Sequence, residues 1–234
     1  MSSAHVMGHE LRPLPLSNLE PIVFVVDNDI FVRESLESLI NWGGWQSETF
    51  ASGHEFLARS RHPVPSCLVL NVSLPDLNGL DLQKRVAVER PNTPIIFITD
   101  QSDVYTSVQA MKAGAVEFLI KPFADDILLG AIQECLNRSC AALSRDAEIR
   151  ALRNSYARLS HRERQVMALV VSGLLNKQVG AELGISEITV KAHRGQVMQK
   201  MKAESFADLV RMAMRLRSEH ALSSPRSHEV SDQF

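Results

Sequence analysis

Residues 21–138 alternate short apolar runs with stretches of helix-like periodicity, and this alternation limits the fold more than any other feature. The apolar runs are bounded by turn-forming residues, which is typical of buried parallel strands. They occupy residues 22–26, 45–50, 67–70, 95–99 and 117–120. Helical patterns are predicted at residues 31–41, 52–60, 80–89, 102–113 and 124–137. Five strand–helix repeats predict a doubly wound α/β fold around a parallel sheet.

Several polar residues follow directly after the predicted strands. The third strand ends at Asn71, before a loop that contains Pro75 and Gly79. Ligands of open α/β sheets bind at the edge formed by the carboxyl ends of the strands. The other residues expected at that edge are Asp27, Asn28, Thr99 and Lys121. We therefore expect a site there.

Four motifs then point to a family. They are residues 25–29 (Val-Val-Asp-Asn-Asp), 70–79, 98–99 (Ile-Thr) and 120–123 (Ile-Lys-Pro-Phe). In this order they resemble the receiver domain of two-component response regulators, over residues 21–138. The resemblance implies a flavodoxin-like (βα)5 fold and a pocket of three carboxylates, in which one aspartate accepts a phosphoryl group beside a divalent cation. The acceptor position is Asn71 here, and Asn28 stands where a second acidic residue is usual.

These two amides predict a degenerate phosphorylation site. An amide oxygen is a poor nucleophile, whereas a carboxylate can carry an acyl phosphate. Two unit charges about 4 Å apart interact by roughly 4 kcal/mol at a dielectric of about 20, so each lost carboxylate weakens cation binding comparably. We expect no metal and no cofactor, and Lys121 becomes free to pair with Asp27. Asp100 either joins that pair or remains a solvated loop residue.

Three further positions match the family. The resemblance implies that the Thr99 hydroxyl and the Lys121 ammonium contact a phosphoryl group, and that the Lys121–Pro122 bond is cis. Phe118 matches the aromatic residue that reports the switch state. Without a phosphoryl group these residues are interpreted as retained scaffold, with a switch driven by another input as the alternative.

A helical pattern continues past the receiver-like region. Residues 139–158 are predicted to form a helical linker, with a break near residues 139–146 as one option. A coiled-coil dimer seam along this linker is a further possibility, but the linker contains too few clean heptads.

The last ordered region is predicted to be a bundle of four short helices. Ser160 and Glu163 fit a capping box, and Gly173 and Gly184 fit helix ends. The helices are expected from Ser160 to Gly173, over residues 176–183, from Ser186 to Ala203, and from Ser205 to Arg217. This pattern indicates an all-α domain containing a helix-turn-helix.

The residues of this bundle point to a second family. The matching positions are Leu159-Ser160, Arg162-Glu163-Arg164, Gly173, Asn176-Lys177, residues 183–186 and residues 189–193. They resemble the LuxR-type DNA-binding domain over residues 159–217, and residues 200–205 and 209–213 resemble its FixJ branch. A receiver followed by this domain implies a transcriptional regulator of the NarL/FixJ class and not an enzyme. The region carries ten Lys/Arg and five Asp/Glu although the whole chain has a net charge of −2, which favours binding to phosphates.

The third helix of the bundle is expected to enter the major groove. Candidate base contacts on its exposed face are Lys191, Ala192, Arg194 and Gly195. Candidate phosphate contacts are Thr189, Asn176, Lys177 and Lys200. We interpret Val190, Val197 and Met201 as core residues, and His193 as a core-edge or phosphate-facing residue rather than a metal ligand.

Composition limits where the protein can be located and which covalent or metal links it can form. The three cysteines lack metal or disulfide spacing, and no apolar run approaches the roughly 20 residues that span a bilayer. We expect a cytoplasmic protein without membrane association. Residues 1–20 are predicted to be a flexible leader and residues 218–234 a disordered tail.

The predicted function is phosphorylation-independent regulation of transcription. The expected partner is double-stranded promoter DNA with two half-sites, bound by a homodimer; a sensor or partner protein is a further candidate. The alternative is a conventional phosphorylation-dependent regulator that uses a substitute acceptor such as Asp76 or Ser73, or in which Asn71 is an engineered replacement. A third hypothesis is an interaction module that titrates another regulator.

Overall fold

The structure is a computed structural model that describes residues 20–61, 63–101 and 103–223. The chain divides into two compact units, with the division between Ser144 and Arg145. The predicted leader and most of the predicted tail lie outside the described residues, and the domain boundaries drawn from the sequence stay predictions. No helix within the described ranges is long and apolar enough to cross a membrane.

The first unit is built around a parallel sheet with the strand order β2-β1-β3-β4-β5. The strands are β1 (Ile22–Val26), β2 (Gln46–Phe50), β3 (Ser66–Asn71), β4 (Ile95–Thr99) and β5 (Glu117–Ile120). The register pairs Val26 with Leu70, Asn71 with Ile98, and Thr99 with Ile120. The carboxyl ends of four strands therefore meet at one edge, and the predicted doubly wound fold is confirmed.

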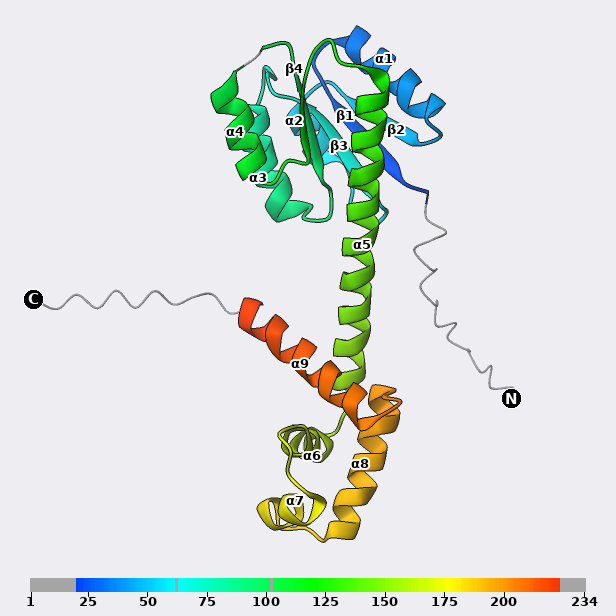
Figure 1. Cartoon of the computed structure of the whole chain (residues 1–234), viewed down its shortest axis with the longest axis vertical. Helices are drawn as coiled ribbons and strands as arrows, with labels where there is room; N and C mark the ends of the chain where they lie inside the picture. Colours follow the sequence, from blue (N-terminus) through cyan, green and yellow to red (C-terminus); the bar gives the residue numbers. More distant parts are fainter. Residues whose placement is uncertain (1–19, 62, 102, 224–234) are drawn as a thin grey trace, which may run out of the picture. The chain divides into compact units, whose positions relative to one another are not determined.

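Helices cover both faces of this sheet (Figure 1). They are α1 (Ile30–Trp42), α2 (Gly53–Ala58), α3 (Gly79–Glu89), α4 (Val104–Lys112) and α5 (Asp125–Ala157). Apolar residues of α1 and α5 pack on one face, and those of α2, α3 and α4 pack on the other. Alternate residues of the central strands enter the two clusters because successive side chains of a strand point to opposite faces.

Helix α5 continues to Ala157 without the break considered near residues 139–146. Ser139, the first residue of that range, is buried. Its hydroxyl accepts a hydrogen bond from Ser66 N at 3.0 Å and donates one to the Asn92 carbonyl. The serine therefore anchors the helix to the sheet, where its hydrogen bonds are satisfied without interrupting the helix.

The second unit contains α6 (His161–Val171), α7 (Asn176–Leu183), α8 (Glu187–Met201) and α9 (Phe206–Ser223). Ser160 and Glu163 form the predicted capping box, and Gly184 ends α7 in the left-handed conformation with φ of 66°. Gly180 faces the turn closely, since a Cβ there would lie 2.7 Å from the Ile185 carbonyl oxygen. Helix α9 extends six residues past the predicted end at Arg217.

Candidate functional site

The group of polar residues at the carboxyl edge of the sheet is centred on the buried carboxylate of Asp27. Its Oδ2 accepts from Lys121 Nζ at 2.9 Å. Its Oδ1 accepts from Asn71 Nδ2 at 3.2 Å and from the Asp29 N–H at 2.9 Å. The buried charge is therefore compensated by one cation and two hydrogen-bond donors from the chain itself.

Asn71 ends β3 and is itself buried. Its amide nitrogen also donates to Asn28 Oδ1 at 3.3 Å, while its Oδ1 accepts from the Ser73 N–H at 3.3 Å. The carboxylate on one side and the N–H on the other fix the orientation of the amide. The side chain thus acts as a donor toward Asp27, where a carboxylate would add a second negative charge.

Asp100 and Thr99 complete the edge. Asp100 Oδ2 lies 3.6 Å from Lys121 Nζ, so Asp100 joins the ion pair although it remains largely exposed. Thr99 is buried, and its hydroxyl accepts from the Gln101 N–H at 3.2 Å. The Lys121–Pro122 bond is cis, as the family resemblance implied.

Phe118 lies apart from these polar residues. Its ring packs against Phe97 with 6.0 Å between ring centroids, and it is half-buried at the edge of the cluster beneath α2, α3 and α4. In this structure Phe118 is therefore directed toward the core.

The Asp76 carboxylate, one of the two substitute acceptors considered in the alternative, forms hydrogen bonds with residues at the start of α2. Its Oδ2 accepts from the His54 N–H at 2.9 Å and lies 2.7 Å from His54 Nδ1, and its Oδ1 accepts from the Gly53 N–H at 3.3 Å. Burial raises the pKa of Asp76, but the hydrogen bonds from His54 and Gly53 outweigh it and leave the pKa below its usual range.

No cluster of three or more metal-ligating side chains occurs among residues 20–61, 63–101 and 103–223.

Helix α8 presents an exposed face that includes three of the four predicted base contacts. Lys191, Ala192 and Gly195 are exposed, and Lys191 Nζ lies 3.0 Å from Glu187 Oε1, also exposed. Three further exposed residues, which the sequence reasoning missed, share this face: Ile188, Gln196 and Gln199. Their three- and four-residue spacing around Lys191 and Gly195 could have identified them.

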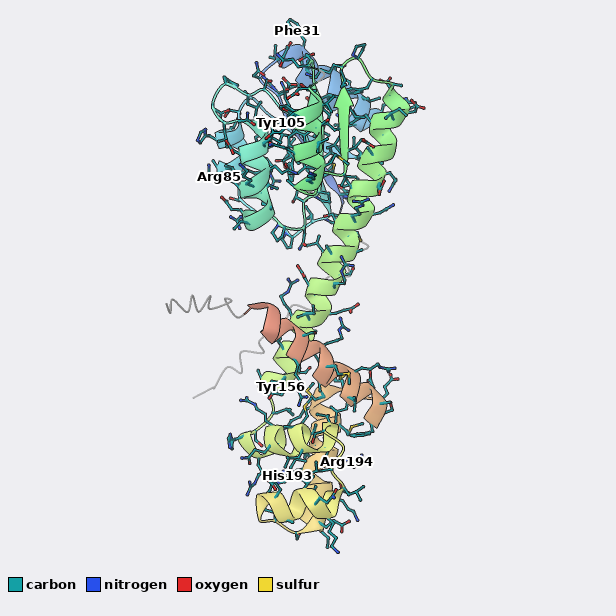
Figure 2. The ribbon with its side chains drawn as sticks, turned by 60° about the vertical axis from the view of Figure 1, so that its left-hand side comes forward. Phe31, Arg85, Tyr105, Tyr156, His193 and Arg194 are labelled. Atoms are coloured by element: carbon teal, nitrogen blue, oxygen red, sulfur yellow. The ribbon has the colours of Figure 1, made fainter. Side chains whose placement is uncertain are left out.

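The predicted placement of Arg194 on that exposed face is wrong. Arg194, labelled in Figure 2, is half-buried. Its Nη1 donates to Asn176 Oδ1 at 3.2 Å, and its guanidinium lies 4.7 Å from the centroid of the Phe206 ring. It follows buried Val190 by four residues and precedes buried Val197 by three, so helix geometry turns it inward.

Among the predicted phosphate contacts, only Lys177 is both exposed and without a partner in the described chain. Thr189 Oγ1 lies 2.8 Å from Ser186 Oγ, and the Asn176 side chain holds Arg194. Lys200 Nζ donates to both carboxylate oxygens of Glu163, at 2.8 and 2.7 Å. The Lys200 ammonium therefore has a structural partner already.

The Glu163 carboxyl is mostly buried, and the hydrogen bond from Lys200, followed by that from the Ser160 N–H, lowers its pKa from the usual value. A Lys200→Met variant should lose about 2 kcal/mol of unfolding free energy at neutral pH, after allowance for the partial exposure of Lys200. Because the folded-state pKa is depressed, this stability is present above the unfolded-state pKa of about 4.3 and is lost as the pH falls through the folded-state pKa. Urea unfolding of both proteins between neutral and acid pH measures this effect: the difference in unfolding free energy between the wild type and Lys200→Met should shrink as the pH falls.

Lys191→Met is the matched control, because it removes an exposed ion pair of the same helix. It should cost no more than about 0.5 kcal/mol at any pH. Equal losses in the two variants would contradict a structural role for Lys200.

Comparisons with known proteins agree with both units. Residues 23–133 match the family described as response regulator receiver domain, and residues 157–213 match bacterial regulatory proteins, luxR family. Nodulation protein W of Bradyrhizobium diazoefficiens is 47% identical over 197 residues, which cover 84% of this chain and 87% of that protein. The chain is a response regulator of the NarL/FixJ class.

Two other relatives of this response regulator extend the comparison. The transcriptional regulatory protein FixJ of Bradyrhizobium diazoefficiens is 38% identical over 193 residues, covering 82% of this chain and 94% of that protein. The solved structure of response regulator StyR is 41% identical with a TM-score of 0.76, covering 84% of this chain and 99% of that one. These relatives are named as regulators and not as enzymes, and the LuxR-type domain makes this chain a DNA-binding protein.

Proposed function

We propose that this response regulator controls transcription without aspartyl phosphorylation. The observation that carries the proposal is Asn71 at the acceptor position, with its amide donating to Asp27. The residue lacks a nucleophilic carboxylate, and the Asp27 charge already has Lys121 as its cation. Asp76 is a poor substitute acceptor because its oxygens are occupied at the start of α2.

DNA recognition is assigned to the exposed face of α8. Lys191 supplies a cation, and Ala192 and Gly195 permit close approach of the helix backbone to the bases. Ile188, Gln196 and Gln199 add apolar and amide groups on the same face. A homodimer would place two such helices on two half-sites of a promoter.

The signal that controls this regulator then has to reach it by a route other than a phosphoryl group on the receiver domain. A partner or sensor protein, or a small ligand, can shift the regulator only by binding one conformation better than another. Without such an input, DNA binding follows the conformational preference of the chain itself.

The test is a footprinting titration on the promoter region of the protein's own gene. The wild-type chain is titrated with and without acetyl phosphate and Mg²⁺, and the Asn71→Asp variant is treated in the same way. Wild-type protection should have the same midpoint in both conditions, whereas the variant gains a donor-dependent change. A wild-type footprint that forms only with the donor would refute the proposal, and radiolabelled phosphoryl transfer followed by peptide mapping would then locate the acceptor.

A further inference from the structure

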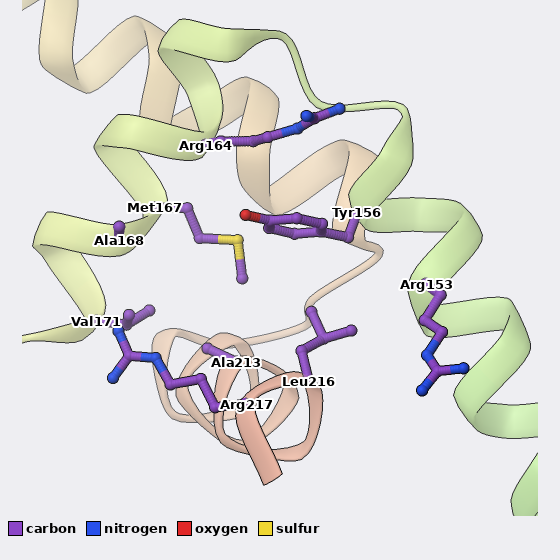
Figure 3. Close-up of a pocket in the computed structure, with 9 residues that line it drawn as sticks. All are labelled: Arg153, Tyr156, Arg164, Met167, Ala168, Val171, Ala213, Leu216 and Arg217. Carbon is purple, nitrogen blue, oxygen red and sulfur yellow. The ribbon is translucent and has the colours of Figure 1, made fainter. Parts of the chain in front are cut away.

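The second unit contains a pocket of about 360 Å³ between the end of α5, α6 and α9. Figure 3 shows the Tyr156 ring and the Met167 side chain directed toward one another in its middle, with Leu216 of α9 beside them. The walls are mainly apolar, and the volume is near the lower end of the range for small-ligand sites, roughly 300–1,000 Å³.

The charged side chains that line this pocket are all cationic. Arg153, Arg164 and Arg217 line it from α5, α6 and α9, and Figure 3 shows Arg153 and Arg217 at opposite margins. No carboxylate is present among the described lining residues. Arg164 and Arg217 bring positive charge to an apolar space, and none of its described lining residues is acidic.

Two of the arginines differ in how they are held. Arg164 lies 5.5 Å from the Tyr156 ring centroid and donates to the Ala157 carbonyl at 3.0 Å, which fixes its position. Arg217 is exposed and makes no hydrogen bond or ion pair within the described part of the chain. Its guanidinium carries five N–H donors in a planar fork that matches a carboxylate.

We propose that this pocket binds a small carboxylic acid with an apolar or aromatic body. The body occupies the space beside Tyr156, Met167 and Leu216, and the carboxylate pairs with Arg217 at the margin. An apolar ligand without charge would leave the Arg217 guanidinium without a partner, and inorganic phosphate would leave the apolar walls exposed. The pocket contains none of the residues around Asn71. This proposal therefore does not depend on whether the regulator acts without phosphorylation.

The test is isothermal titration calorimetry of the full-length protein with 4-phenylbutyrate as the probe. The uncharged 4-phenylbutan-1-ol, which keeps the apolar body, serves as the matched ligand control. The acid should bind, and the alcohol should bind roughly tenfold more weakly because it lacks the charge-assisted hydrogen bonds.

Three variants locate the binding. Arg217→Gln should weaken binding of the acid by roughly tenfold. Arg211→Gln, which removes an exposed arginine of the same helix that pairs with Asp208, should change nothing. Ala168→Phe adds a ring from an exposed lining position, and should abolish binding while the thermal unfolding midpoint stays unchanged.

Each other outcome overturns the proposal. Equal affinity of the acid and the alcohol would remove the role of the arginines, and binding that survives Ala168→Phe would place the probe elsewhere. Absence of any binding would show that the pocket is not a site for such acids. Binding that weakens as protein concentration rises would identify a second copy of the chain as the occupant.

Discussion

An Asn71→Asp variant is expected to unfold at a lower temperature than the wild-type protein, and Mg²⁺ is expected to reverse the loss. Asn71 Nδ2 lies 3.2 Å from Asp27 Oδ1, so the substitution replaces a hydrogen bond by two facing carboxylates. Unit charges at that separation repel by about 5 kcal/mol at a dielectric of about 20. Part of this repulsion is offset by the Lys121 ammonium and by a proton shared between the two carboxylates. A net loss of about 2 kcal/mol should lower the midpoint by several degrees, measured by calorimetry in EDTA.

Magnesium should restore stability because the variant regains a second oxygen ligand of negative charge beside Asp27. Asn78→Asp is the matched control: it makes the same charge change at the exposed N-cap of α3, where the side chain accepts from the Leu80 N–H. This control should keep its midpoint in EDTA and show no response to Mg²⁺. An Asn71→Asp variant as stable as the wild type in EDTA would show that relief of carboxylate repulsion does not govern this pocket.

The parallel sheet and the position of Asn71 were predictable from sequence for a simple physical reason. Buried parallel strands are short apolar runs, and their carboxyl ends share one edge, so residues far apart in sequence converge there. The pairing of Lys121 with Asp27 followed from the same rule. Burial of the Asn71 amide and its contact with the Ser73 N–H could not be predicted from sequence, because both depend on the path of the loop that follows β3.

The DNA-binding surface was less predictable because charge in a sequence does not reveal a buried partner. Lys200 and Glu163 are separated by 37 positions, and no local sequence pattern predicts that they pair. Arg194 is different, since its spacing from Val190 and Val197 already indicated an inward position. Ile188 was passed over because an apolar residue is usually interpreted as core, although it is 80% exposed here.

Substitution of Gly195 should separate DNA binding from stability. A Cβ at this position would meet no atom within 4 Å, and glycine inside a helix costs roughly 0.5–1 kcal/mol relative to alanine. Gly195→Ala should therefore raise the unfolding free energy by about that amount. If the exposed face of α8 enters the major groove, the same methyl group should weaken DNA binding, because it occupies the space that glycine leaves for the bases.

Gly195→Glu should weaken DNA binding more strongly than Gly195→Ala, because it adds a negative charge as well as volume. A carboxylate on this face would approach the DNA bases and phosphates, and such like-charge contact costs several kcal/mol, so affinity for the promoter should fall by more than about 100-fold. Gly130→Glu is the matched control in α5, where a Cβ also meets no atom within 4 Å; it should leave promoter binding unchanged. Mobility-shift titrations measure both variants. Full promoter affinity in Gly195→Glu would exclude this part of α8 from the interface and would move recognition to another surface of the unit, because a helix seated in the groove cannot accommodate an extended anion at its point of closest approach.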